Sequence, residues 1–246
     1  MIKLETLEIA GWQPSIIGMR NPMNSWDRSD SKTINYTLKA EEVCPGVTAM
    51  VSVPCEPYIS VGPNDHELMM KLAKGGPVHA KYRRMIVIYV DITAPLYWWK
   101  EFDTYKVGTV ANSCSTMHKI HAKEFELGDF SHEHLSNEEF GVNGLRSTTS
   151  MDILGIIVDA LNYYRKCFIE DGKSKDDWYN MIQLLPSSYN QKRTIMLNYE
   201  VLVGMYRDRK NHKLDEWHTF CDWIESLPYS EIIIGEKEKN DEIQTV

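Results

Sequence analysis

Two short stretches of this 246-residue chain carry side chains that can do chemistry. In the first, a small polar run holds Asn112, Cys114 and Ser115, which offer an amide, a thiol and a hydroxyl group. The thiol would be a nucleophile if a neighbouring cation lowered its pKa, and Lys106 and His118 are near enough in sequence to do so. The plainer interpretation, which we favour, is a buried and unreactive Cys114.

The second stretch is a predicted amphipathic helix from Gln191 to Arg209, in which Asn198 and Arg209 stand eleven residues apart. This spacing is about three turns at 3.6 residues per turn, so the two polar groups share one face of the helix. Together they could touch two parts of one ligand. A plainer role for Arg209, as one of several cations that complement the helix dipole, stays open.

Phosphate and metal chemistry have weaker signals. The glycine-containing sequences GPND and KGGP match neither the Walker nor the dinucleotide pattern, so phosphate recognition would depend on charge-assisted hydrogen bonds from cations. His132 and His134 form an H-x-H pair, but no cluster of further ligands accompanies them, and we expect no metal site. The cations available for phosphate are Arg83, Arg84, Lys106 and Arg209.

Composition limits the class of protein. With 43% hydrophobic and 25% charged residues the chain resembles an ordinary folded protein, and a net charge of −8 argues against non-specific binding to nucleic acid or acidic membranes. The five cysteines are scattered and lack C-x-x-C spacing, which favours reduced thiols. We see no signal peptide pattern and no long apolar run, and therefore expect a cytoplasmic protein.

The elements that must position these groups alternate in type along the chain. Apolar β-branched runs predict strands, and apolar residues at three- and four-residue spacing predict helices. The predicted class is α/β (α+β), a single domain over residues 1–234 with a mixed or antiparallel sheet flanked by several amphipathic helices, followed by a charged, disordered tail over residues 235–246. The expected strands are Ile2–Ile9, Val47–Pro54, Met85–Val90 and an edge strand Ser230–Ile234; the expected helices are Asn64–Gly75 capped by Asn64, one after Pro95 carrying Trp98, Phe102 and Tyr105, Ser150–Cys167 capped by Ser150, Asp176–Leu185, Gln191–Arg209 and Leu214–Leu227.

Residues 11–31 are rich in Gly, Pro, Asn and Ser, which is typical of a loop. A loop of about twenty residues in a compact domain is more often functional, or ordered by a partner, than idle. Arg20, Asn21, Asn24 and Trp26 could bind a ligand or a neighbouring subunit. A surface loop with one anchoring tryptophan is the plainer alternative.

The sequence from Ala94 to His118 resembles the flavin-dependent thymidylate synthases. In that family a strand and an Ala-Pro-aliphatic-aromatic helix lead into the signature R-H-R-x-x-S-x-N-E-x-S-x-R, and here Ala94-Pro95-Leu96-Tyr97 leads without a gap into TYKVGTVANSCSTMH. The framework matches, whereas the signature side chains match only in part. Thr104, Tyr105 and Lys106 stand in place of R-H-R, and Thr109, Ala111 with Asn112, Cys114 and Thr116 take the places of the first serine, the N-E pair, the second serine and the last arginine.

Two further segments extend the resemblance to about a third of the chain. Upstream, His79 takes the place of the family's histidine in G-H-x-S/T-x-x-E-H, although Arg84 and Met85 replace the E-H pair. Downstream, a Leu-Pro helix with an asparagine, an arginine eleven residues on and then a histidine is matched by Leu185-Pro186, Asn198, Arg209 and His212, while Glu200 replaces an arginine of the family.

The resemblance implies methylation of dUMP, with FAD as hydride carrier, NADPH as reductant and methylene-tetrahydrofolate as one-carbon donor, by a homotetramer with shared sites. It implies that Arg209 is catalytic and orients the pyrimidine, that Asn112, Cys114 and Ser115 contact the nucleotide, and that His79, Lys106, Asn198 and His212 line the flavin. The threonines at 104 and 116 support an alternative, because a neutral hydroxyl cannot replace an arginine at a phosphate. The alternative is a non-catalytic protein of the same fold that sequesters or senses a nucleotide and has lost the FAD site, so whether the protein is an enzyme stays open.

Overall fold

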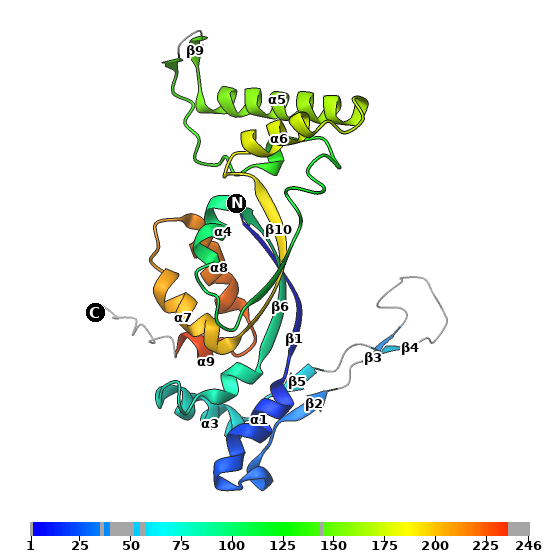
Figure 1. Ribbon diagram of the computed structural model, residues 1–246. Helices are drawn as coiled ribbons and strands as arrows, with labels where there is room; N and C mark the ends of the chain where they lie inside the picture. The colour runs from blue at the N-terminus through cyan, green and yellow to red at the C-terminus, as the bar shows by residue number, and fades with distance from the viewer. Residues whose placement is uncertain (1, 35–36, 40–51, 55–57, 143–144, 236–246) are drawn as a thin grey trace, which may run out of the picture. The chain divides into compact units, whose positions relative to one another are not determined.

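A computed structural model of the chain describes residues 2–34, 37–39, 52–54, 58–142 and 145–235 (Figure 1). The predicted tail after Gly235, and the predicted strand Val47–Pro54 up to residue 51, lie outside these residues. The chain forms two compact units, each built from three segments. Unit 1 comprises Met1–Glu8, Tyr89–Met196 and Asn211–Trp223, and unit 2 comprises Ile9–Ile88, Leu197–Lys210 and Ile224–Val246.

The main sheet has four strands in the order β1-β6-β10-β7. Its strands are β1 (Lys3–Ala10), β6 (Val87–Pro95), β7 (Val110–Ser113) and β10 (Asn190–Asn198). β7 pairs with β10 in antiparallel fashion, with Arg193 opposite Ser113 and Met196 opposite Val110. Three two-stranded antiparallel pairs accompany it: β2 (Lys32–Ile34) with β5 (Tyr58–Ser60), β3 (Thr37–Lys39) with β4 (Ser52–Pro54), and β8 (Phe140–Val142) with β9 (Leu145–Thr148).

An aromatic cluster forms one core of unit 1, between α4 (Leu96–Phe102) and α8 (Asp215–Ser226). The ring of Trp98 is fully buried and lies 4.7 Å from the ring of Trp217 and 5.8 Å from that of Phe220, measured between centroids. Aromatic rings bury large apolar areas and prefer such tilted arrangements. The cluster therefore holds α4 in place, and α4 is the helix that precedes residues 104–116, the segment that aligns with the family signature.

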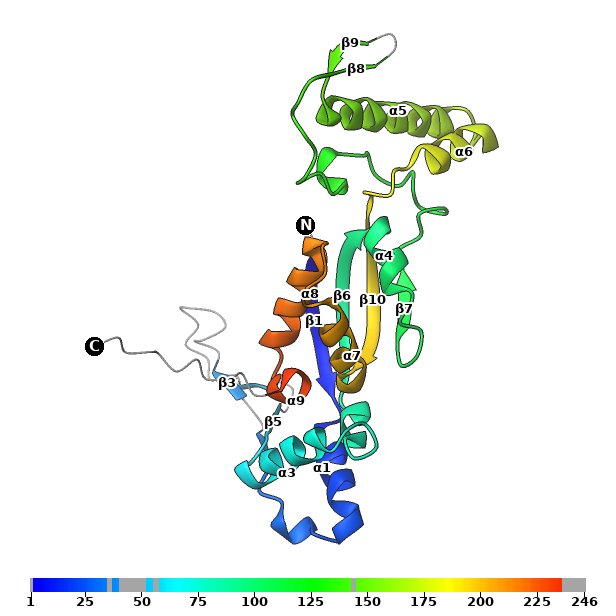
Figure 2. The same ribbon diagram turned by 90° about the vertical axis from the view of Figure 1, so that its left-hand side faces the viewer.

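A second core of unit 1 lies where α5 (Ser150–Glu170) packs on α6 (Lys175–Leu184), which are side by side in Figure 1 and Figure 2. Leu154, Leu161 and Phe168 of α5 and Met181 of α6 are buried together. The N-cap of α5 is Thr149, which forms a capping box with Asp152, rather than the predicted Ser150. Thr149 takes this position because it has Asp152 three residues later, and the capping box needs that spacing.

Unit 2 holds α1 (Trp12–Arg20), α3 (Pro63–Lys74), α7 (Tyr199–Arg209), α9 (Glu231–Ile234) and three 3-10 turns, η1 (Asn21–Met23), η2 (Trp26–Arg28) and η3 (Lys81–Met85). Trp12 packs edge-on against Tyr199 and Tyr229, with ring centroids 5.4 and 5.3 Å away. Gly11 precedes α1 with φ +89°, and a Cβ there would lie 1.9 Å from the carbonyl oxygen of Met85. Only glycine fits this position.

Residues 11–31 were predicted as a loop, and this prediction is wrong for the first half, which is the helix α1. Trp12, Ile16 and Met19 are buried at spacings of four and three residues, the pattern of one helix face. Pro14 does not break the helix because it stands in the first turn, where its missing N–H has no intrahelical acceptor. The Gly, Pro, Asn and Ser content of residues 11–31 predicted a loop, although Trp12, Ile16 and Met19 already had the spacing of a short amphipathic helix.

The predicted helix Gln191–Arg209 is wrong over its first half, which is the strand β10. Gln191, Ile195 and Leu197 are buried and lie on alternate positions, which is the period of a strand. The helix α7 begins only at Tyr199.

Three smaller predictions also differ from the structure. Residues 230–234 include the short helix α9 rather than a strand. The helix α3 is capped by Gly62, with Pro63 in its first turn, rather than by Asn64, and the strand expected from Met85 begins at Val87.

Candidate functional site

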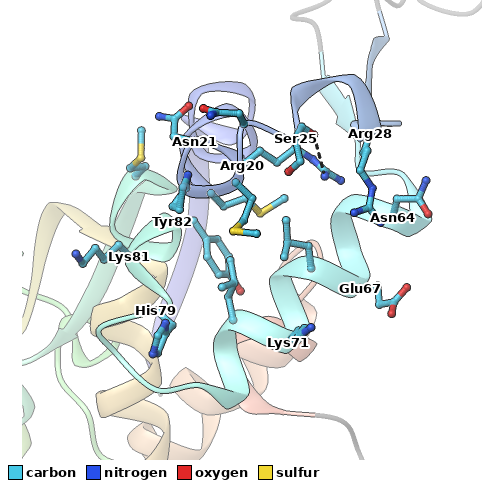
Figure 3. Close-up of a pocket in the computed structure, with 18 of the residues that line it drawn as sticks. Arg20, Asn21, Ser25, Arg28, Asn64, Glu67, Lys71, His79, Lys81 and Tyr82 are labelled. Carbon is cyan, nitrogen blue, oxygen red and sulfur yellow. Dashed lines mark hydrogen bonds between the residues drawn. The ribbon is translucent and has the colours of Figure 1, made fainter.

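Unit 2 contains an open cavity of about 1090 Å³. Three segments line it: the end of α1 with η1 and η2, one face of α3, and residues 78–85 (Figure 3). On α3 the lining positions Asn64, Glu67, Leu68, Lys71 and Leu72 follow the helical period, so a single face is presented. The size is that of small-molecule sites, which typically measure about 300–1,000 Å³.

Asp65 ties the first wall of the cavity to the second. Nε of Arg20, which is only 4% exposed, donates to Oδ1 of Asp65 at 2.6 Å. Oδ2 of Asp65 accepts from the hydroxyls of Ser29 and Ser31 at 2.8 and 2.6 Å, and from the backbone N–H of Ser31 at 3.0 Å. Burial by itself raises the pKa of Asp65, but the hydrogen bonds from Ser31, Ser29 and Arg20 outweigh burial and lower it.

Asp30 provides a second link between the same walls. Its carboxylate accepts from the backbone N–H groups of Asn64 and Asp65 at 2.9 and 3.1 Å, which satisfies the N-terminus of α3. Nη1 of Arg20 also donates to the carbonyl oxygen of Ser25 at 3.2 Å, the dashed line in Figure 3. The residues that follow α1 are therefore fixed in place by a network of ion pairs and hydrogen bonds.

The lining combines apolar and charged side chains. Met19 and Tyr82 are buried and Leu68 is half-buried, which gives the cavity an apolar part. Exposed Arg28 and Lys71 line it as well, and neither forms an ion pair with any residue that the structure describes. Cations beside an apolar surface suit a ligand that joins a flat ring to an anionic group. The remaining charged lining residues are Lys81, Asp27 and Glu67, and Arg20 is neutralised by Asp65.

Of the sequence-predicted cofactor residues, His79 is the one that lines this cavity. Asn198, also in unit 2, is the N-cap of α7, and its side-chain oxygen accepts from the N–H of Val201 at 3.1 Å. Because Asn198 precedes the helix, the prediction that it shares a helical face with Arg209 is wrong. Arg209 is the last residue of α7 and is half-buried.

Replacing Asn198 by alanine is expected to lower the free energy of unfolding by about 1 kcal/mol, because the N–H of Val201 loses its acceptor. Asn198→Ser should recover most of this loss, since a serine hydroxyl caps a helix about as well. Urea denaturation of the two variants and the wild type measures the difference. Equal stability of Asn198→Ala and the wild type would contradict the capping role.

The other sequence-predicted site residues belong to unit 1. Asn112 lies in β7 opposite Thr194, and Cys114 follows the strand, with its N–H donating to the carbonyl of Lys192 at 2.9 Å. The Ser115 hydroxyl accepts from the N–H of His118 at 2.9 Å and so closes a turn. Cys114 is exposed, which corrects the expectation of a buried thiol: β7 is an edge strand whose four residues are all exposed.

The remaining two predicted residues flank the aromatic cluster of unit 1. Lys106 is exposed in the loop after α4. His212 is packed near Trp217, its Nδ1 accepts from the N–H of Leu214 at 3.2 Å, and its Nε2 lies 3.4 Å from Oε2 of Glu101. Five of the eight predicted residues thus lie in unit 1 (Lys106, Asn112, Cys114, Ser115, His212) and three in unit 2 (His79, Asn198, Arg209).

The first signature position has a structural role. The hydroxyl of Thr104 donates to the backbone carbonyl of Glu101 at 2.7 Å, just after the end of α4. The same carbonyl also accepts the backbone N–H of Thr104 at 3.1 Å, so the hydroxyl adds a second bond at the end of the helix. Thr104 therefore stabilises the end of α4 and brings no positive charge to this loop.

Arg20, Asn21 and Asn24, which the sequence offered as candidates for binding a ligand, all line this cavity. The sequence did not point to Asp65 and Asp30, which join the cavity walls. Their partners lie more than thirty residues away in the chain, at Arg20 and along α3. No local pattern signals such contacts. The helical spacing of the α3 lining residues was a further signal, and it becomes informative only once the cavity is known.

Comparison with known proteins gives matches among solved structures. No protein-family model matches the chain, and no curated protein matches it. Thymidylate synthase X from Helicobacter pylori, solved with FAD and dUMP, is similar at a TM-score of 0.59 and 15% identity, over 94% of this chain and 96% of that one. A second structure of the flavin-dependent enzyme from H. pylori, complexed with FAD and dUMP, gives 0.57 and 16% over the same shares. The UMP/dUMP methylase PolB from Streptomyces cacaoi, bound with 5-Br UMP, gives 0.51 and 11% over 92% and 88%.

These neighbours first establish the class: an α/β fold with antiparallel pairing and several helices, as the sequence predicted. More particularly, the chain has the fold of the flavin-dependent thymidylate synthases, which confirms the resemblance seen in the sequence. No helix among the described residues is both long and apolar enough to cross a membrane.

Proposed function

We propose that this protein binds a pyrimidine nucleotide such as dUMP together with FAD, as a flavin-dependent thymidylate synthase-like protein. The observation that carries the proposal is the unit 2 cavity, lined by His79, in a fold whose solved neighbours were determined with FAD and dUMP. The proposal keeps the roles that the resemblance implies: Arg209 for the pyrimidine, Asn112, Cys114 and Ser115 for the nucleotide, and His79, Lys106, Asn198 and His212 for FAD.

The unit 2 cavity fits a flavin in size and chemistry. Its volume of about 1090 Å³ is large enough for a dinucleotide. Met19, Leu68 and Tyr82 offer apolar surface for a ring, and Arg28 and Lys71 offer cations for phosphates. Bound FAD would supply hydride transfer, while the residues of the chain bind and orient the partners of the reaction. For an active enzyme, NADPH and methylene-tetrahydrofolate complete the set, and a cytoplasmic homotetramer is the expected form.

An absorption spectrum in the near-ultraviolet and visible range, recorded after mixing the protein with FAD and removing free FAD by gel filtration, tests the cofactor. Flavin peaks that stay with the protein support the proposal, and dUMP-dependent oxidation of the reduced flavin is then the assay for catalysis. A protein that retains no flavin would exclude the synthase activity.

Replacing Arg209 by alanine is expected to weaken dUMP binding by about 1.5–3 kcal/mol, the contribution of a hydrogen bond to a charged group. Isothermal titration calorimetry measures the affinity. Arg207→Ala is the matched control, because Arg207 lies on the same helix turn, carries the same charge and is 76% exposed. Unchanged affinity in Arg209→Ala would remove Arg209 from the nucleotide site.

One observation favours the second candidate function, a nucleotide-binding protein without catalysis. The side chain of Thr104, where the family has an arginine, is bonded to the carbonyl of Glu101 and supplies no charge. On this alternative the protein binds dUMP but retains no FAD. The same gel-filtration experiment followed by a dUMP titration separates the two functions.

A further inference from the structure

Arg193 on β10 binds one end of the segment that runs from Asp103 to Cys114 directly and the other end through Gln191, all within unit 1. Its Nη1 donates to Oδ1 of Asp103 at 2.7 Å. Its Nε donates to Oε1 of Gln191 at 3.0 Å, and Nε2 of Gln191 donates to the carbonyl oxygen of Cys114 at 2.7 Å. One guanidinium therefore links the start of this segment to its end.

The guanidinium is itself held firmly. It stacks over Trp99, with its central carbon 4.2 Å from the ring centroid, and the Arg193 side chain is only 13% exposed. Nε1 of Trp99 donates to the carbonyl of Gln191 at 3.0 Å, so Gln191 is fixed by the same indole. Gln191 and Arg193 alternate along β10 and share a face, whereas Lys192 and Thr194 point to the other face and bind Asp91.

Between these anchors, Tyr105 packs edge-on against Trp217 with ring centroids 6.2 Å apart, and the Thr109 hydroxyl donates to the Tyr105 carbonyl, but the rest of the segment buries little surface. Residues 106–108 are exposed, with Val107 at 90%, and all four residues of β7 are exposed. A segment with little buried surface opens locally at low free-energy cost. Beyond these two contacts, the order of residues 110–114 depends on the pairing of β7 with β10 and on the links through Arg193.

We propose that Arg193 is a positioning residue that holds residues 103–114 in one conformation and thereby sets the affinity for the nucleotide. The second part rests on the proposed function, because Asn112, Cys114 and Ser115 are its candidate nucleotide contacts. Arg193 suits this role because its planar fork reaches Asp103 and Gln191 at once while stacking on Trp99. A lysine ammonium is a point charge on a flexible stem and cannot do all three.

Hydrogen–deuterium exchange of the intact protein tests the positioning role. In Arg193→Gln and Arg193→Lys, the amides of residues 110–114 are expected to exchange at least about tenfold faster than in the wild type, while those of α5 are unchanged. Lys192→Gln is the matched control, because it removes an ion pair on the opposite face of the same strand and should leave exchange at 110–114 as in the wild type. Equal exchange in the wild type and Arg193→Gln overturns the proposal.

A second variant guards against misfolding of the Arg193 variants. Asp103 is 53% exposed, so Asp103→Asn should fold while it weakens one link of Arg193. We expect the amides of residues 110–114 to exchange faster in Asp103→Asn than in the wild type. The double variant Asp103→Asn/Arg193→Gln should exchange no faster than Arg193→Gln alone, because both substitutions break the same set of contacts. Wild-type exchange in Asp103→Asn, or fully additive effects in the double variant, contradicts the link through these contacts.

A dUMP titration of the same variants tests the link to binding. Arg193→Gln is expected to weaken dUMP affinity about tenfold, because the free protein then samples conformations that cannot bind. Faster exchange with unchanged affinity would overturn the second part of the proposal. A wild-type protein that binds no dUMP would refute the proposed function instead, and the exchange rates would still decide the role of Arg193.

Discussion

Replacing Asp65 by asparagine is expected to lower the free energy of unfolding by about 3–5 kcal/mol, because it leaves the guanidinium of Arg20 buried without its counter-charge. The side chains of Arg20 and Asp65 are 4% and 0% exposed, so water cannot take over the lost interaction. Urea denaturation measures the change. Glu67→Gln, an exposed neighbour on the same helix, is the matched control and should change stability by less than about 0.5 kcal/mol.

The same carboxylate predicts a loss of stability in acid. Because the folded pKa of Asp65 is lowered from its ordinary value of 3.8, the unfolded chain binds the proton more readily than the folded chain does. The stabilisation by Asp65 is therefore complete above that ordinary value and is lost as the pH falls through the lower folded pKa. Asp65→Asn should remove this part of the acid sensitivity; an unfolding profile between pH 2 and 5 identical in both proteins would contradict it.

Replacing Trp98 by alanine is expected to cost about 3–5 kcal/mol, the range for deleting a fully buried large aromatic side chain. Trp98 lies at the centre of the aromatic cluster of unit 1, between Phe102, Trp217 and Phe220. The deletion would leave a cavity that the rigid neighbouring rings cannot fill. Thermal and urea unfolding measure the loss.

Phenylalanine at this position is a sharper test. Nε1 of Trp98 is buried and has no hydrogen-bond partner among the described residues, whereas Nε1 of Trp99 donates to Gln191. Trp98→Phe removes an N–H that contributes nothing, but Trp99→Phe leaves a carbonyl without its donor. We therefore expect Trp99→Phe to be the more destabilising of the two by about 1 kcal/mol; the reverse order would show that the Trp98 N–H has a partner.

Helices with a strong apolar period could be predicted from the sequence. The pattern of Ile153, Ile156, Ile157 and Leu161 predicted α5, because its spacing fits a helix and no strand, although Ile156 is 50% exposed. The helix Gln191–Arg209 was predicted from Ile195, Tyr199, Leu202 and Tyr206, whose spacing is helical, but Ile195 and Leu197 also alternate as in a strand. The strand formed because Gln191 and Arg193 bind groups just after α4 and just after β7, and such long-range contacts cannot be seen in the local sequence.

The same reasoning explains what could be predicted of the site. His79 was found because a family pattern surrounds it, and it does line the unit 2 cavity. Asn198 and Thr104 matched family positions by spacing, but spacing cannot show that one side chain caps α7 and the other binds the end of α4. The cavity as a whole was not predictable, because its walls come from segments joined by Asp30 and Asp65 over long sequence distances.

The three segments of unit 1 leave the ribosome at different times, because they lie far apart in the sequence. The N–H of the Trp223 indole donates to the hydroxyl of Thr6, 217 residues earlier. Trp98 packs against Trp217 and Phe220, which belong to the same C-terminal segment of unit 1. At about 5–20 residues per second, a ribosome needs roughly 10–40 seconds to make the intervening chain. Thr6 lacks its partner Trp223 for that time, and the α4 aromatics lack theirs for about half of it, so the nascent chain is a candidate client for chaperones that shield apolar surface.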